Sequence, residues 1–146
     1  FGGIALVAAG ASLLNAALVE RLGMRMMVTT VLSVQIVVSS VVAVLFWTEA
    51  LGPAASFVVY LVWTTGIFAQ ASLTLGNLNA LAMAPMGHLA GLTASVAGAV
   101  GTVIAVSLAV PIGLMFDDTP QPLVTGTLVL ALLARLLIRS LNRASD

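Results

Sequence analysis

The chain has 146 residues, of which 61% are hydrophobic and 7% are charged. A water-soluble domain carries about 25% charged residues because its exterior must be polar, so this composition excludes a soluble globule. The net charge of zero excludes a nucleic-acid binder built on clustered Lys and Arg, and the absence of cysteine excludes disulfides and thiolate sites. The remaining class is an all-α integral membrane protein with the lipid bilayer as its partner.

The uncharged stretches of the chain predict five membrane-spanning helices. A membrane helix needs roughly 20 apolar residues, and the charged residues divide the chain into stretches of that length or longer. The longest stretch is interrupted by a polar segment around Pro85, which stops a helix, so it reads as two spans joined by a turn. The expected spans cover residues 1–19, 26–48, 56–75, 90–116 and 122–138. The predicted fold is therefore a polytopic bundle of five transmembrane helices.

The charged loops predict how the bundle lies in the membrane. Five crossings place the first loop, the Pro85 turn and the C-terminus on one side, and the two other loops on the opposite side. The arginines all fall on the first side, and three acidic residues without any base fall on the second: Arg21, Arg25, Arg135, Arg139 and Arg143 against Glu49, Asp117 and Asp118. Arginine-rich loops face the cytoplasm. The expected topology is a cytoplasmic C-terminus and an external N-terminus.

The first loop contains a short motif of charged residues around a glycine. Glu20, Arg21, Gly23 and Arg25 form a tight turn in which Gly23 can take a positive φ. One interpretation is a positively charged cytoplasmic loop and nothing more. The segment also resembles the loop signature of the major facilitator superfamily, Gly-x-x-x-Asp-Arg-x-Gly-Arg-Arg, in its second-half copy. Arg21, Gly23 and Arg25 match that signature, and Glu20 stands where it has Asp.

The polar segment between the third and fourth expected spans is a second motif. Asn77 and Asn79 can cap a helix end, Pro85 stops the helix, and Gly91 begins the next one. His88, the lone histidine, is interpreted first as a solvated interfacial group and second as a proton relay. The segment is similar to the loop between the tenth and eleventh helices of twelve-helix drug/proton antiporters, and most similar to the bicyclomycin-resistance type.

The third expected span carries a polar stripe on an otherwise apolar helix. Tyr60, Thr64, Gln70 and Thr74 recur at helical spacing, with Trp63 beside them. Polar side chains within a span face protein or a water-filled cavity, because lipid does not satisfy them. Tyr60, Trp63, Thr64 and Gln70 are therefore candidates for a substrate cavity. The alternative is that the stripe forms hydrogen bonds between helices.

The fourth expected span presents a face of small residues that includes Gly91, Ser95, Gly98 and Thr102. We interpret this face first as a close-packing surface and second as a cavity wall, to which Ser95 and Thr102 would contribute. In the second span, Gln35 stands apart from the other polar residues and is interpreted as helix packing.

Helix number and charge pattern agree with helices eight to twelve of a major-facilitator transporter. Five spans that start at Phe1, without an initiator Met or a leader segment, predict the C-terminal piece of a longer protein. The resemblance implies a multidrug/proton antiporter of the bacterial inner membrane, with a small-molecule substrate and with the missing N-terminal half as partner. Proton antiport requires an intramembrane carboxylate, and no acid lies within an expected span, so that group is expected in the missing half.

Two other functions remain open. One is a metabolite or sugar transporter of the same fold, and the other is a five-span membrane scaffold that transports nothing. The sequence shows no nucleophile–base pair, metal-ligand cluster or phosphate-binding loop. Enzymatic activity, a cofactor, a metal site and a nucleic-acid partner are therefore not expected.

Overall fold

The computed structural model describes residues 2–144, except for the side chains at positions 4, 5, 8, 12, 16 and 142–144. The all-α prediction is confirmed. The elements in chain order are α1 (Gly2–Leu22), α2 (Met24–Trp47), α3 (Pro53–Met83), the 3₁₀ helix η1 (Ala84–Leu89), α4 (Ala90–Leu114) and α5 (Gln121–Ala144). The side chain of Arg143, one of the arginines used to predict topology, lies outside the described residues.

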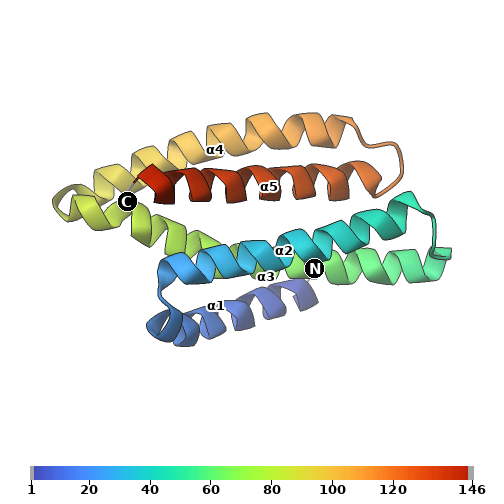
Figure 1. Cartoon of the computed structure of the whole chain (residues 1–146), viewed down its shortest axis with the longest axis horizontal. Coiled ribbons are helices and arrows are strands. Elements are labelled where there is room, and N and C mark those ends of the chain that lie inside the picture. The colour runs from blue at the N-terminus through green and yellow to red at the C-terminus, as the bar shows by residue number, and fades with distance from the viewer. Residues whose placement is uncertain (1, 145–146) are drawn as a thin grey trace.

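The helices run back and forth along one long axis (Figure 1). α3 is central, with α1 and α2 packed against it, and α5 packs against α2. The hydrophobic core lies where α2, α3 and α5 meet, and includes Phe46, Trp63 and Val124. α4 lies outside this core beside α5, and none of its residues is buried.

The joints between helices follow from glycine and proline. Gly23 separates α1 from α2 with φ 78° and ψ 152°, so the predicted positive φ is confirmed. Pro53 begins α3, where its missing N–H has no helical partner to lose. Pro85 lies in η1, and the next residue, Met86, leaves helical geometry at φ −122° and ψ 37°. The chain folds back there, so that α3 and α4 run in opposite directions (Figure 1).

The third helix is longer than predicted. α3 continues beyond Leu75 to Met83, so Asn77 and Asn79 lie inside it rather than in a turn. Asn77 is accommodated because its side-chain amide donates to the carbonyl oxygen of Leu73 at 2.8 Å and to Oδ1 of Asn15 in α1 at 2.7 Å. The helix ends only where Pro85 approaches, so proline and not asparagine sets this boundary.

The predicted number of spans is wrong as stated. Among the described residues, three helical segments are long and apolar enough to cross a membrane: Met24–Trp47, Pro53–Leu114 and Gln121–Leu141. The predicted turn around Pro85 is the 3₁₀ helix η1. The helices α3, η1 and α4 follow one another directly, so Pro53–Leu114 is one apolar stretch of 62 residues in which the chain reverses direction at Met86. Three apolar segments of this length make the chain a candidate multi-pass membrane protein.

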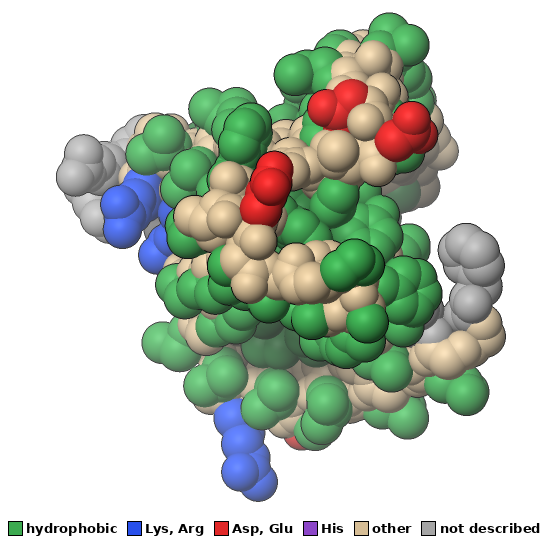
Figure 2. Space-filling view, turned by 90° about the vertical axis from the view of Figure 1, so that its right-hand side faces the viewer, with side chains coloured by type: hydrophobic (Ala, Val, Ile, Leu, Met, Phe, Trp, Pro, Cys, Tyr) green, Lys and Arg blue, Asp and Glu red, His purple; other side chains and the backbone are tan. Residues whose placement is uncertain are grey.

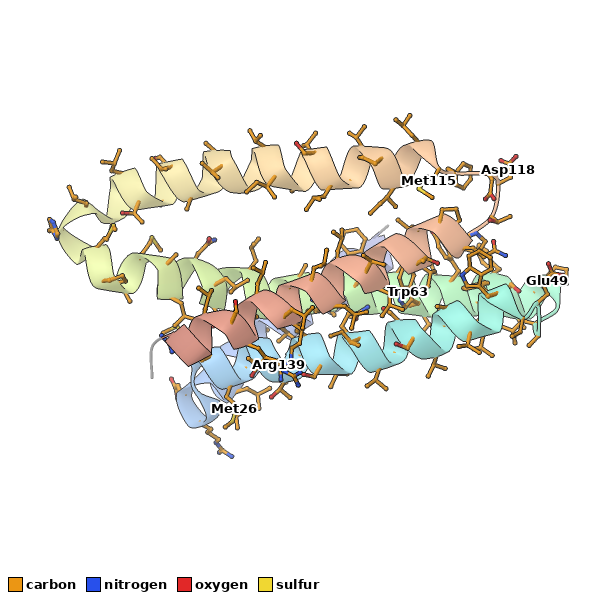
Figure 3. The ribbon with its side chains drawn as sticks, turned by 45° about the horizontal axis from the view of Figure 1, so that its top comes forward. Met26, Glu49, Trp63, Met115, Asp118 and Arg139 are labelled. Atoms are coloured by element: carbon orange, nitrogen blue, oxygen red, sulfur yellow. The ribbon has the colours of Figure 1, made fainter. Side chains whose placement is uncertain are left out.

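Charged side chains collect at opposite ends of the bundle. Figure 3 shows Glu49 and Asp118 at one end and Arg139 away from them, on the C-terminal part of α5, and Figure 2 looks onto the acidic side chains of the first end. Arg25 lies near the C-terminal part of α5, because it lines a small hollow together with Ile138. We call these the acidic end and the basic end. The structure thus groups the loops as the charge pattern predicted.

Candidate functional site

A buried polar cluster joins α2 and α3 inside the bundle. The Ser39 hydroxyl oxygen accepts two hydrogen bonds, one from the Gln35 side-chain amide at 2.8 Å and one from the Trp63 indole N–H at 3.0 Å. Ser39 is 0% exposed, Trp63 4% and Gln35 6%. We call these three residues the Ser39 cluster. The Ser39 hydroxyl oxygen is therefore the hydrogen-bond acceptor for two buried donors, the Gln35 amide and the Trp63 indole N–H.

Tyr60 and Thr64 flank this cluster on α3. The Tyr60 and Trp63 rings lie with their centroids 6.1 Å apart and their planes tilted by 39°. Tyr60 is half-buried against the core and also lines a hollow of about 370 Å³ at the acidic end. The Thr64 hydroxyl oxygen is buried without a hydrogen-bond partner in the described part of the chain. The structure therefore brings Tyr60 and Trp63 together against the core, with Thr64 next to Trp63 in α3.

The rest of the polar stripe continues along α3 toward the basic end. Gln70 is half-buried, and its backbone carbonyl accepts the Thr74 hydroxyl at 2.9 Å. Asn77 is 4% exposed and joins α3 to α1 through its bond to Asn15. Polar contacts along α3 thus link it to both α1 and α2. Such contacts between helices are the alternative to a substrate cavity that the polar stripe left open.

The candidate residues of α4 lie apart from that cluster. Ser95 and Thr102 are exposed, and each hydroxyl donates to a carbonyl of its own helix, that of Gly91 at 3.0 Å and that of Gly98 at 2.8 Å. α4 approaches α3 near Asn79, at the η1 end, and elsewhere lies beside α5. The chain by itself does not bring Ser95 and Thr102 to the Tyr60 region.

The two loop motifs lie toward the basic end. Glu20, Arg21 and Arg25 are exposed around Gly23. Arg25 also lines a hollow of about 270 Å³ between α2, α3 and α5. In the second motif Asn77 is buried, whereas the remaining members are exposed: Asn79, Pro85, His88 and Gly91. Each motif thus combines exposed polar groups with one residue that the fold requires: Gly23 for its positive φ, and Asn77 for its buried bond to Asn15.

A hollow between two helices was not predicted from the sequence. It lies between α4 and α5 at the acidic end and has a volume of about 690 Å³, within the range of small-molecule pockets. Its walls are mostly aliphatic, and include Leu108, Ile112, Met115, Val129, Leu130 and Leu133. No motif marks these residues, because aliphatic side chains are the ordinary content of any membrane helix.

The polar residues around this hollow tie α5 to α2. The Trp47 indole N–H donates to the Thr125 hydroxyl at 3.0 Å, and the Gln121 amide donates to the Phe46 carbonyl oxygen at 3.3 Å. The hollow narrows where α4 meets α5, since a β-carbon at Gly126 would lie 2.7 Å from Cδ1 of Ile112. The α5 wall of the hollow is therefore held firmly on the core, and the α4 wall approaches it closely at one glycine.

Within the described residues, no group of three or more His, Asp and Glu side chains is placed to hold a metal ion. In the part of the chain that the structure describes, the candidate sites are the Ser39 cluster and the hollow between α4 and α5. No protein-family model, no curated protein and no solved structure matches this chain.

Proposed function

We propose that the chain is a membrane-embedded part of a secondary transporter, corresponding to helices eight to twelve of a major-facilitator-type protein. The observation that supports this most is a set of apolar helices that keep hydrogen-bonded polar side chains between them. Instances among the described residues are the Ser39 cluster, the Asn15–Asn77 bond and the Trp47–Thr125 bond. Polar groups within membrane helices are costly and mark substrate pathways or interhelical ties.

The membrane arrangement that fits this proposal has α3 and α4 crossing separately. A straight helical segment of 62 residues would be about 93 Å long, roughly three times the hydrocarbon core. The reversal of direction at η1 divides it into two helices, α3 and α4, each long enough to cross the bilayer. With α1 as a further crossing, the acidic end faces outward and the basic end faces the cytoplasm of a bacterial inner membrane.

This topology predicts which positions a membrane-impermeant thiol reagent reaches. Because the native chain has no cysteine, single cysteines at Glu49 and Asp118 should be labelled from outside intact cells. A cysteine at Arg25 should be labelled only after the membrane is permeabilised. Labelling of Glu49 and Asp118 from opposite sides would contradict the separate crossing of α3 and α4.

The proposed activity is efflux of small xenobiotics by proton antiport. Transporters of this fold form the substrate site between two halves, so α4, which buries none of its residues here, would complete a cavity against the other half. Tyr60, Thr64 and Gln70 would supply polar contacts in that cavity. The proton-carrying acid would come from the other half, because each acidic residue that the structure describes lies in a loop or near a helix end: Glu20, Glu49, Asp117 and Asp118.

The test of this function uses the full reading frame that contains the chain, expressed in a drug-sensitive host. Tyr60→Ala and Gln70→Ala should each change resistance several-fold for some compounds and not for others, since one ligand hydrogen bond contributes about 1 kcal/mol. Leu61→Ala is the matched control, because Leu61 is exposed on the same helix. Resistance is normalised to membrane expression.

Three outcomes separate the alternatives. A changed compound profile at normal expression supports a cavity role for the stripe. A lower folded yield with an unchanged profile assigns these residues to helix packing. Absence of any resistance or uptake from the wild-type frame would favour the membrane scaffold over a transporter.

A further inference from the structure

The hollow between α4 and α5 has the length of one leaflet of a bilayer. Its α5 wall runs from Gln121, near the acidic loop, to Leu133. These positions are about 18 Å apart along a helix, close to half of the roughly 30 Å hydrocarbon core. Several wall residues are also open to the outside of the bundle, including Met115 at 67% exposure and Leu133 at 50%. In a membrane, an open aliphatic hollow of this length lies against lipid chains.

The polar mouth of the hollow offers hydrogen-bond acceptors and negative charge. Asp117 lines it and is exposed, and one of its carboxylate oxygens accepts the backbone N–H and the hydroxyl of Thr119. The Gln121 amide nitrogen is used by Phe46, while its amide oxygen is buried without a partner among the described residues. The mouth therefore suits a ligand that carries donors and positive charge.

We infer that this hollow is a headgroup-selective site for a phospholipid with a primary ammonium group, such as phosphatidylethanolamine. One acyl chain would lie along Leu108, Leu130 and Leu133, and the ammonium would reach the Asp117 carboxylate. A primary ammonium supplies three donors and no acceptor, which complements the acceptors at the mouth. A trimethylated ammonium supplies the charge without donors, and an anionic headgroup meets repulsion from the acidic end.

The inference does not depend on transport. Lipid binding at this hollow requires only that the acidic end lies at the level of the lipid headgroups. The protein could therefore transport without binding this lipid, or bind the lipid without transporting. A lipid held between α4 and α5 would contact α4, which buries none of its residues, and so would support the position of α4 beside the core.

The experiment measures which lipids stay bound to the intact protein that carries this chain. The protein is reconstituted with equal amounts of phosphatidylethanolamine, phosphatidylcholine and phosphatidylglycerol of identical acyl chains, and bound lipids are counted by native mass spectrometry. We expect phosphatidylethanolamine to exceed phosphatidylcholine by about two- to fivefold, the scale of an exposed charge pair. Phosphatidylglycerol should be retained least.

Two variants, each with a matched control, locate the bound lipid. Asp117→Asn keeps the oxygen that Thr119 uses but removes the charge, and should reduce the preference to near parity. Asp118→Asn, one residue away and outside the walls of this hollow, should preserve it. Leu130→Trp fills the hollow and should lower retention of all three lipids, whereas Leu136→Trp, exposed elsewhere on α5, should not.

Equal retention of phosphatidylethanolamine and phosphatidylcholine by the wild-type protein would overturn the headgroup assignment. Equal lipid counts for Leu130→Trp and Leu136→Trp would overturn the site itself, because a bulky side chain in the hollow would then displace no lipid. If Leu130→Trp lowers folded yield, the comparison of Asp117→Asn with Asp118→Asn still decides the assignment.

Discussion

Replacing Ser39 with alanine is expected to lower the free energy of unfolding by about 1–3 kcal/mol, the cost of leaving buried donors unsatisfied. Ser39 is fully buried, and its oxygen accepts from both Gln35 and Trp63. A single hydrogen bond between membrane helices contributes about 0.6 kcal/mol on average. The larger value is expected here because two buried donors lose their acceptor at once. Unfolding of the purified protein by denaturing detergent measures the change.

Ser40→Ala is the matched control for this substitution. Ser40 is half-buried, and its hydroxyl donates to the Ile36 carbonyl of its own helix at 2.7 Å, so its loss leaves no donor on another helix without a partner. In a Trp47→Phe background, the emission of Trp63 should shift for Ser39→Ala and not for Ser40→Ala. Equal stability of the two variants would mean that the Ser39 cluster does not hold α2 against α3.

Replacing Gly23 with alanine is expected to cost about 1–3 kcal/mol and to impair transport by the full-length protein, while membrane insertion stays unchanged. The values of φ 78° and ψ 152° lie close to a backbone region that only glycine occupies readily. An added β-carbon would meet no atom within 4 Å, so the penalty is conformational and not a clash. Gly23→Leu should therefore behave much as alanine does. Insertion depends on apolar length and on arginine placement, which neither variant changes.

Gly98→Ala is the control for the glycine prediction. Gly98 also has open space around it but lies within α4, where alanine is favoured over glycine by about 1 kcal/mol. It should be neutral or slightly stabilising. The distance between spin labels on α1 and α2 measures directly whether the turn at Gly23 keeps its geometry. An unchanged distance and normal transport in Gly23→Ala would reduce the loop to a topological signal.

Local features of this fold could be predicted from the sequence because they depend on neighbouring residues. An apolar composition with few charges requires helices that satisfy their own backbone in lipid. Pro85 interrupts the helix, and Gly23 permits a backbone conformation that other residues avoid. The positions of the arginines and acids along the chain also determine which loops share an end, because alternate crossings must return there.

The extent of the third helix was not predictable from the same pattern. Asn77 was predicted to cap the end of that helix near Leu75. In the bundle its amide meets Asn15 of α1, sixty-two positions away, so the helix continues through it. The turn around Pro85 is a 3₁₀ helix that follows α3 directly, and the chain reverses direction within it at Met86, which leaves helical geometry.

The sequence by itself determined that this chain forms apolar helices with a basic and an acidic end, and that polar residues lie along one of those helices. Only the tertiary structure decided which groups these residues meet. Gln35 was interpreted as packing, yet it shares an acceptor with Trp63, and the hollow between α4 and α5 has walls of unremarkable aliphatic residues. The physical reason is that helical periodicity gives the face on which a side chain lies but not the helix opposite it. Pairing across helices depends on how every segment of the bundle packs at once.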